Sequence, residues 1–346
     1  MKSVDHKCIN CNAVLKYNPK GKNWECEYCG STFNKSDLTE NEEKYKEAKV
    51  KEDVKTPEIE MDEYTCQNCG AKIVADSNTS ATFCVYCRNT AILKSRLTDK
   101  FEPNRIIPFT KTKEDAIEGF KKICKGKLFI PNEFALERNI NEIKGVYIPF
   151  WLHSYDMHVH LTGTGNNIQT WTVGNTVFTK TEVYNIDREA DYSFESVPVD
   201  GSKRFDDAIM NSVEPFDYVE LTEFSPSYLS GFFAEKYDVE EPDADRIAYD
   251  RSSKTSFSAL TKSIRHQSFV PSTKEITCKN KEHEYVLLPV WMVNVKYNGK
   301  MYPFAMNGQT GKMIGDIPYS KGKAFKWFMI IFIITFVVLM LITFIL

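Results

Sequence analysis

The amino-acid sequence predicts an α+β protein with two N-terminal four-cysteine zinc ribbons, a charged linker, a duplicated antiparallel-sheet-plus-helix domain and one C-terminal transmembrane helix. Three observations predict this organisation. Eight of the ten cysteines form four C-x2-C pairs before residue 90, strand and helix patterns alternate over residues 100–320, and the last 20 residues carry no charge. With 346 residues, 42% of them hydrophobic and 26% charged, the chain is long enough for two or three domains. This composition excludes wholly disordered, collagenous and multi-span membrane proteins.

The cysteine pairs form two copies of the pattern C-x2-C-x14-C-x2-C, offset by 58 residues. The eight predicted metal ligands are Cys8, Cys11, Cys26, Cys29, Cys66, Cys69, Cys84 and Cys87. Two residues between paired cysteines let one tight turn aim both sulfurs inward, and the intervening hairpin brings the second pair opposite. We therefore expect two structural Zn²⁺ ions, one in ribbon 1 (residues 1–35) and one in ribbon 2 (residues 64–98). A disulfide framework is the alternative, which is disfavoured because no signal peptide is evident at the N-terminus.

Glycines follow two of the cysteine pairs directly. Gly30 and Gly70 are residues that tolerate the positive φ such turns often need.

Residues 36–63 form the charged linker, with eleven acidic and five basic residues. Thr39 and Glu42 match a capping box, which predicts a short helix at about residues 40–54. We interpret the linker as a solvated spacer, and an acidic docking motif is the alternative.

Residues 100–320 show the periodicities of an α+β domain. Helical spacing is found in Lys111–Cys124, Ser227–Tyr237 and Asp243–Ile264. Strand patterns are found in Val146–Leu161, Ile168–Val173, Val177–Ile186, Tyr285–Tyr297 and Lys300–Ala305. Antiparallel sheets with helices laid over them are the expected architecture.

Glycine-containing sequences mark the turns of this domain. Asn298-Gly299 predicts a type I′ hairpin, and Asn307-Gly308 predicts the next turn of the same meander. We interpret Gly163-Thr164-Gly165 as a turn between two strands rather than as a phosphate-binding loop. The stretches Val146–Leu152 and Val286–Met292 resemble each other at an offset of 140 residues, which predicts an internal duplication.

The C-terminal segment predicts a membrane span. Residues 327–346 contain only Thr335 and Thr343 as polar residues, and 20 residues of helix measure about 30 Å, the thickness of a hydrocarbon core. Three lysines precede the span, at positions 321, 323 and 326. The positive-inside rule then places the N-terminal body in the cytoplasm, anchored in the cell membrane by a single pass, with the C-terminus outside. A reducing cytoplasm agrees with thiolate-bound zinc.

Four polar residues of one strand are candidates for a different metal site: His153, Asp156, His158 and His160. Asp156, His158 and His160 would share one strand face, but alternating polar residues are also typical of the solvated face of a half-buried strand, which we favour. Phosphate-binding, dinucleotide-binding, metalloprotease and serine-hydrolase motifs are absent from the sequence. We interpret Cys124 and Cys278 as packing residues, and we do not expect an enzyme.

Nucleic-acid binding is the main competing function for zinc ribbons. Each ribbon has a net charge of +3, and a zinc ion held by four thiolates subtracts two, which leaves about +1. Trp24, Tyr28 and Tyr86 would stack on bases if they were exposed, but a small ribbon equally needs them as its core. The sequence therefore favours protein partners over nucleic acid.

The eight ribbon cysteines, the stretch Pro149–Leu152, and the run from Pro289–Met292 through Tyr302–Lys312 into the final helix resemble a bacterial family of membrane zinc-ribbon proteins. These are the YdjG-like proteins encoded beside PspA in Gram-positive bacteria. The resemblance implies a membrane anchor or partner for envelope-stress proteins of the PspA and SPFH type. From the closed metal sites, the single anchor and the absence of a visible catalytic motif, we expect a membrane-anchored adaptor that recruits other proteins. The alternatives are a membrane-tethered nucleic-acid binder and an enzyme with an unrecognised site in residues 100–320.

Overall fold

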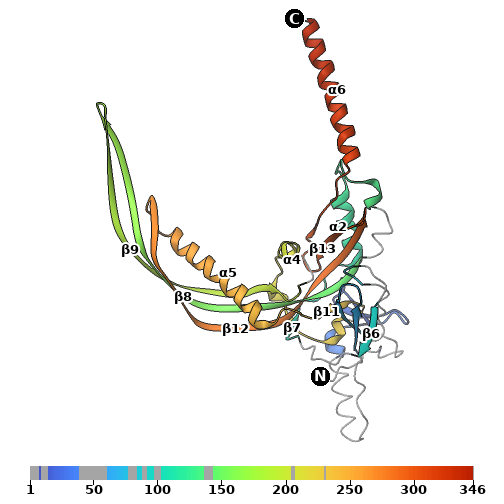
Figure 1. The fold of residues 1–346 in the computed structure, drawn as a ribbon. Coiled ribbons are helices and arrows are strands. Elements are labelled where there is room, and N and C mark those ends of the chain that lie inside the picture. Colours follow the sequence, from blue (N-terminus) through green and yellow to red (C-terminus); the bar gives the residue numbers. More distant parts are fainter. Residues whose placement is uncertain are drawn as a thin grey trace. The chain divides into compact units, whose positions relative to one another are not determined.

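Figure 1 shows the computed structural model of the chain, a mixed α+β structure of sheets and helices. The structure describes residues 8, 15–38, 61–76, 84–87, 92–96, 103–135, 143–203, 207–229 and 231–345. The predicted linker helix lies outside the described residues. The chain divides into two compact units: unit 1 has residues 1–148, 204–236 and 287–346, and unit 2 has residues 149–203 and 237–286. The domain boundaries that we derived from the sequence stay predictions.

Ribbon 1 contributes a small antiparallel sheet to unit 1. Its strands are β1 (Leu15–Asn18), β2 (Asn23–Cys26) and β3 (Thr32–Phe33). Alternation along β1 and β2 buries Leu15, Tyr17 and Trp24 on one face. The turn between the two strands is closed by Asn18, whose side chain accepts a hydrogen bond from the backbone N–H of Lys20 at 2.9 Å.

Ribbon 2 is part of a larger sheet rather than a separate module. The main path of this sheet runs in the order β10-β7-β12-β8-β11-β5-β4-β6, and three further strands described below pair beside it. Its strands are β4 (Met61–Cys66), β5 (Lys72–Asp76), β6 (Ile92–Arg96), β7 (Arg105–Ile106), β8 (Lys144–Val173), β10 (Thr222–Glu223), β11 (Phe233–Glu235) and β12 (Ser268–Tyr297). In unit 1, β11 runs antiparallel to β5, with Ala234 opposite Val74, and parallel to β8, with Phe233 opposite Val146.

The helix that we predict over Ser227–Tyr237 is wrong. The segment forms a 3-10 turn, Pro226–Leu229, and then strand β11. Gly231 has a φ of +84°, which a helix does not accept, and it separates the two elements. The backbone hydrogen bonds of β11 are made to β5 and β8, so partners distant in sequence override the local helical spacing.

The hairpin predicted at Asn298-Gly299 is confirmed. Both residues have positive φ, 48° and 75°, and they connect β12 to β13 (Lys300–Asn307), with Tyr297 opposite Lys300. The next turn closes on Asn307, whose side-chain oxygen accepts hydrogen bonds from the backbone of Gln309 at 2.9 Å and Thr310 at 2.8 Å. Strand β14 (Met313–Gly315) follows this turn and pairs with β13.

The predicted helix over Lys111–Cys124 is also confirmed, as α2 (Lys113–Cys124). Thr112 and Asp115 form a capping box at its start, in which the Asp115 carboxylate accepts from the Thr112 N–H at 2.8 Å. Phe120 is fully buried, and its ring lies 5.0 Å from that of Phe304 on β13. The helix therefore covers one face of the β13–β14 pair.

An aromatic cluster forms the core of unit 1. The Phe109 ring stacks on Phe232 at 4.3 Å and meets Trp291 edge-on at 5.1 Å. The Trp291 Nε1–H donates to the Lys111 carbonyl at 2.8 Å. Gly308 is required here, because a Cβ at this position would lie 2.6 Å from the Phe109 ring. Other short elements of unit 1 are the 3-10 turns Asn132–Ala135 and Tyr218–Glu220 and helix α4 (Asp207–Val213).

Unit 2 is built on a long antiparallel pair with a helix laid on it (Figure 1). Strand β8 pairs with β9 (Thr176–Asp200) from Phe150 opposite Asp200 to Val173 opposite Thr176. Helix α5 (Glu241–Lys262) confirms the helix predicted at Asp243–Ile264. Its buried face repeats every four residues along Ala244, Ala248, Ser252, Ser256 and Leu260. Leu260 packs on Val159 and Leu161 of β8.

The turn that we predict at Gly163-Thr164-Gly165 is wrong, because β8 continues through it, with Gly163 opposite Ile186. These glycines permit close contact instead. A Cβ on Gly163 would lie 2.4 Å from the Val270 carbonyl oxygen, and one on Gly165 would lie 2.8 Å from the His266 ring. Glycine in a strand interior thus marks the approach of another segment here rather than a reversal.

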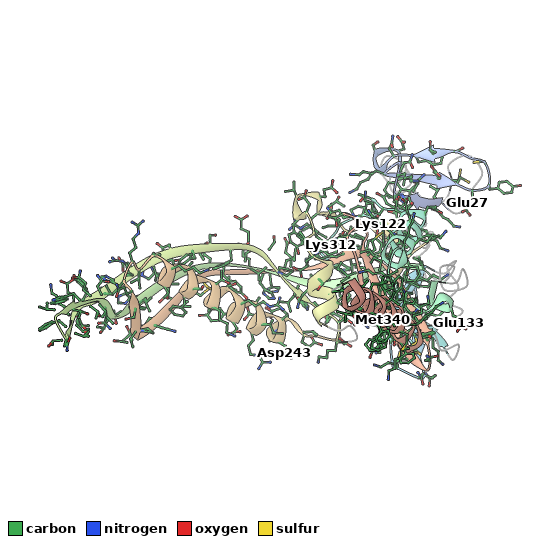
Figure 2. The ribbon with its side chains drawn as sticks, turned by 90° about the horizontal axis from the view of Figure 1, so that it is seen from above. Glu27, Lys122, Glu133, Asp243, Lys312 and Met340 are labelled. Carbon is green, nitrogen blue, oxygen red and sulfur yellow. The ribbon has the colours of Figure 1, made fainter. Side chains whose placement is uncertain are left out.

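The C-terminal segment of unit 1 is helix α6 (Lys321–Ile345). Its stretch Lys321–Ile342 is long and apolar enough to cross a membrane, with a mean hydropathy of 2.7 and none of the apolar window buried. Met340 is one of its exposed side chains (Figure 2). The helix has no polar face, unlike α2, which is the pattern of a helix surrounded by lipid.

Candidate metal centres

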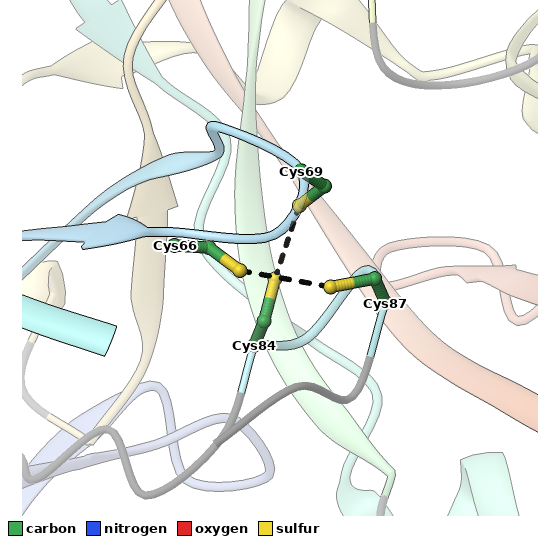
Figure 3. A group of neighbouring side chains, drawn as sticks. All are labelled: Cys66, Cys69, Cys84 and Cys87. Atoms are coloured by element: carbon green, nitrogen blue, oxygen red, sulfur yellow. Dashed lines mark hydrogen bonds between the residues drawn. The ribbon is translucent and has the colours of Figure 1, made fainter. Parts of the chain in front are cut away.

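Four cysteines of ribbon 2 direct their sulfur atoms toward one another (Figure 3). The Sγ atoms of Cys66 and Cys87 are 3.6 Å apart, and so are those of Cys69 and Cys84. A disulfide requires about 2.05 Å between sulfurs. Tetrahedral coordination with metal–sulfur bonds of about 2.3 Å places the sulfurs about 3.8 Å apart. The cluster therefore fits a tetrahedral metal ion and not two disulfides.

The backbone around Cys66 and Cys69 explains how two sulfurs face one point. The Gly70 N–H donates to the Cys66 carbonyl at 2.8 Å, and the Cys66 N–H donates to the Ala71 carbonyl at 2.9 Å. Gly70 adopts a φ of +70°, as the sequence predicts. The turn thus leaves both cysteine side chains on its inner side.

Ribbon 1 repeats this local geometry around Cys26 and Cys29. The Gly30 N–H donates to the Cys26 carbonyl at 2.8 Å, and Gly30 has a φ of +73°. Cys8, Cys26 and Cys29 gather into a second cluster, in which the Cys8 and Cys29 sulfurs are 3.4 Å apart. Cys11 lies outside the described residues. Three of the four predicted ligands of ribbon 1 are therefore brought together.

The electrostatics of the ribbon 2 cluster favour a bound cation. Cys66 and Cys84 are fully buried. Burial raises the pKa of the Cys84 thiol well above its ordinary value, and it raises the pKa of Cys69 too. Several thiolates packed this closely repel one another and are poorly solvated. A divalent ion at their centre would supply the compensating charge, as in tetrathiolate zinc sites.

No family model and no solved structure matches the chain. The uncharacterized protein YdjG of Bacillus subtilis (strain 168) is 34% identical over 333 residues, which cover 94% of this chain and 93% of the relative. The chain belongs to the YdjG family. Coverage from end to end means that the likeness extends well beyond the ribbon cysteines.

The ribbon 2 cluster of this YdjG-family chain has a polar support that the sequence analysis missed. Asn294 of β12 is buried, and its side-chain amide donates to the carbonyls of Val85 and Tyr86, both at 2.7 Å. These carbonyls belong to the turn between Cys84 and Cys87. Asn294 therefore fixes the second cysteine pair from a strand more than 200 positions away in sequence. The sequence feature that could have predicted this role is an asparagine at a core position of an otherwise apolar strand.

The aromatic residues of the ribbons differ in exposure. Trp24 is buried, and its Nε1–H donates to the Ser227 carbonyl at 3.3 Å. Tyr86 is half-buried beside the ribbon 2 cysteines, whereas Tyr28 is 85% exposed. Trp24 thus serves the fold of unit 1, and Tyr28 is the single member of this trio that presents an open ring.

The polar residues of β8 separate into two groups. Asp156, His158 and His160 lie on the half-exposed face, as predicted for a solvated strand. His158 contacts Asp191 at 3.0 Å, His160 contacts Asp187 at 2.8 Å, and Asp156 accepts from Ser193 and Asn280. The hydrogen bond that His160 donates to Asp187 raises the pKa of His160. These three residues therefore pair with neighbouring strands, while His153 is buried away from them.

Proposed function

We propose that this YdjG-family chain is a membrane-anchored zinc-ribbon adaptor that recruits partner proteins to the membrane. The observation that carries the proposal is the closed set of four sulfurs in ribbon 2. Four sulfurs around one ion leave no coordination position for water or substrate, so the ion would be structural. A structural ribbon on a chain with an apolar terminal helix suits a tethered binding module better than an enzyme.

The metal component of the proposal is two Zn²⁺ ions per chain. Cys66, Cys69, Cys84 and Cys87 would hold one, and Cys8, Cys11, Cys26 and Cys29 would hold the other. Neither ribbon contains much apolar material, and zinc contributes on the order of 10 kcal/mol or more to the folding of such modules. Metal analysis of the Cys66→Ser/Cys84→Ser variant should show one zinc ion fewer than wild type. An unchanged zinc content would overturn the ribbon 2 assignment.

The membrane component assigns residues 327–346 to the bilayer and the N-terminal body to the cytoplasm. The apolar, exposed surface of α6 and the lysines at positions 321, 323 and 326 support this topology. A reporter that is active only in the cytoplasm should be silent when it is fused after Leu346 and active when it is fused before Met1. The reverse pattern would overturn the orientation.

Protein partners are favoured over nucleic acid. Each zinc-bound ribbon would have a net charge near +1, which neutralises few phosphates. Trp24 is buried in the core, so its ring is not exposed to stack on a base. PspA-type and SPFH-type envelope-stress proteins are the partner class implied by the family resemblance. The internal duplication of Val146–Leu152 and Val286–Met292 stays part of this proposal, and both stretches are buried.

Cross-linking in intact membranes tests the adaptor function. We expect the full chain to cross-link to a defined set of proteins, and the Cys66→Ser/Cys84→Ser variant to lose part of that set. Cys278→Ser is the matched control, because Cys278 is an exposed cysteine outside both clusters. An identical set of cross-linked proteins from both variants would contradict a role of ribbon 2 in recruitment. Recovery of nucleic acid with a steep salt dependence would instead support the nucleic-acid alternative.

A further inference from the structure

Unit 2 contains a buried histidine whose polar atoms have no hydrogen-bond partner among the described residues. The His153 side chain is fully buried, and in the described part of the chain neither of its ring nitrogens makes a hydrogen bond. Buried polar side chains are almost always satisfied, because an unpaired polar atom loses its hydration without compensation. His153 therefore needs an explanation that hydrogen bonding within the described chain does not give.

Two carboxylates from the first turns of α5 face the same point. Glu241 and Asp245 are four residues apart on the helix and so lie on one side of it. Ligand atoms of His153, Glu241 and Asp245 all lie within 4.8 Å of one another. The Glu241 Oε1 atom is buried and, like the His153 nitrogens, lacks a hydrogen-bond partner in the part of the chain that the structure describes. The ring nitrogens of His153 and a carboxylate oxygen of Glu241, which lack hydrogen-bond partners among the described residues, thus lie close together.

Two separations, one within this cluster and one at its rim, match a coordination shell better than a hydrogen-bonded network. His153 Nδ1 lies 3.6 Å from Asp245 Oδ1, and His283 Nδ1 lies 3.5 Å from Glu241 Oε1. Hydrogen bonds between such atoms measure about 2.7–3.2 Å. Two ligands that each lie about 2.1 Å from a tetrahedral ion are about 3.4 Å apart.

We propose that His153, Glu241 and Asp245 bind a divalent transition-metal ion, with His283 at the rim of the site. One imidazole or two, together with two carboxylates, form the mixed nitrogen and oxygen set that suits zinc, manganese or iron(II). Three protein ligands, of which His153 is buried and the two carboxylates are partly exposed, would leave a coordination position for water or another ligand, in contrast to the closed sulfur cluster of ribbon 2. This site is independent of the adaptor function proposed above.

The surroundings of Asp245 resemble the outer shell of a metal site. The Tyr155 hydroxyl donates to Asp245 Oδ1 at 2.8 Å, and Lys281 Nζ pairs with Asp245 Oδ2 at 2.7 Å. Hydrogen-bonded partners of this kind hold a ligating carboxylate in one orientation. The Lys281 cation opposes metal binding, but it pairs with the oxygen other than the one nearest His153. One carboxylate charge, on Glu241, is left after this pairing.

The alternative is that the cluster is structural. Acidic residues in the first turn of a helix are common, since they interact favourably with the helix dipole, and a buried neutral histidine can act as a packing residue. Burial lowers the pKa of His153, which keeps the ring neutral under either interpretation. The two interpretations differ in one measurable respect, which is whether the full chain takes up an ion that depends on His153.

The test compares the metal content of purified full-length variants in detergent after equilibration with Zn²⁺ alone and removal of free metal. We expect wild type to retain one ion per chain more than His153→Ala and Glu241→Gln. His158→Ala is the matched control, because His158 is on the same strand but pairs with Asp191, and it should retain the wild-type number. The difference between variants is the readout, so the result does not depend on how many ions the ribbons hold.

A titration with Mn²⁺ followed by electron paramagnetic resonance provides a second measurement, because tetrathiolate sites disfavour this harder ion. Wild type should bind one Mn²⁺ that both variants fail to bind. Equal metal contents in wild type, His153→Ala and Glu241→Gln would overturn the proposal, and so would an equal loss in His158→Ala. If His153→Ala does not fold, as judged by circular dichroism, Glu241→Gln decides alone, since Glu241 is 25% exposed.

Discussion

Replacing Asn294 by Ala should weaken metal binding at ribbon 2 and leave ribbon 1 unchanged. The substitution removes two hydrogen bonds of 2.7 Å, a buried one to the carbonyl of Val85 and a partly buried one to that of Tyr86. Each such bond contributes about 1 kcal/mol net, so the turn that carries Cys84 and Cys87 loses about 2 kcal/mol of support. At about 1.4 kcal/mol per factor of ten, this amounts to about 30-fold in apparent affinity. Loss of an outer-shell partner at metal sites typically costs about 10- to 100-fold.

Competition with a chromophoric chelator measures this effect on the full chain in detergent. We expect one zinc ion of Asn294→Ala to transfer at a chelator concentration about 30-fold lower than in wild type, and the other to transfer as before. Asn307→Ala is the control, because its amide also donates to two backbone carbonyls, those of Val213 and Pro215, at 3.1 Å each. The reasoning is refuted if Asn294→Ala releases both ions like wild type, or if Asn307→Ala shifts one ion equally.

Four further predictions concern a second residue of ribbon 2 and three other parts of the chain. Gly70→Ala should destabilise the ribbon 2 turn by about 1–2 kcal/mol through backbone strain alone, because no atom of the described residues lies within 4 Å of the added Cβ. Faster zinc release should reveal it, and unchanged release would contradict the strain argument. Thr112→Ala should lower the free energy of unfolding by about 1 kcal/mol through loss of the α2 cap, measured by denaturant titration. Phe336→Arg, in the middle of α6, should cost about 2.5–3.5 kcal/mol of insertion free energy, so that alkaline carbonate extracts the variant from membranes. The pKa of His160 is raised by its hydrogen bond to Asp187. The contribution of this pair to the stability of the folded state is therefore present below the unfolded pKa of about 6.5, and it is lost as the pH rises through the folded pKa. Asp187→Asn should lower that pKa in a histidine NMR titration, and no shift would exclude the pairing.

Features set by local sequence could be predicted, and those set by distant partners could not. The cysteine spacing, the Asn298-Gly299 hairpin and the apolar run of α6 each act through neighbouring residues. The local sequence predicts a helix where β11 lies, because the partners of this strand, β5 and β8, are far away in sequence and strands depend on pairing more than helices do. The local sequence predicts a turn at Gly163 for the same reason, since the segment that approaches this glycine begins about a hundred positions later.

The candidate sites divide in the same way. The ribbon ligands follow a spacing rule, so their residue numbers can be read directly from the sequence. Asn294 and Glu241 have no such rule, because each becomes relevant only when the fold places it beside residues from another segment. His153 was grouped with Asp156, His158 and His160 by proximity in sequence, whereas the structure buries it near the start of α5. A strand face is a better guide to ligand sets than a stretch of sequence.

The position of ribbon 2 within the sheet has a consequence for metal starvation. Strands β4, β5 and β6 lie beyond β11, and β5 pairs with Ala234 and Glu235. If loss of the ion unfolded ribbon 2, β11 would become an edge strand with unpaired N–H and C=O groups, flanked by buried apolar residues. Such edges recruit strands from other molecules. The ion of ribbon 2 would then protect the chain from self-association, and zinc depletion should be followed by aggregation as well as by loss of binding.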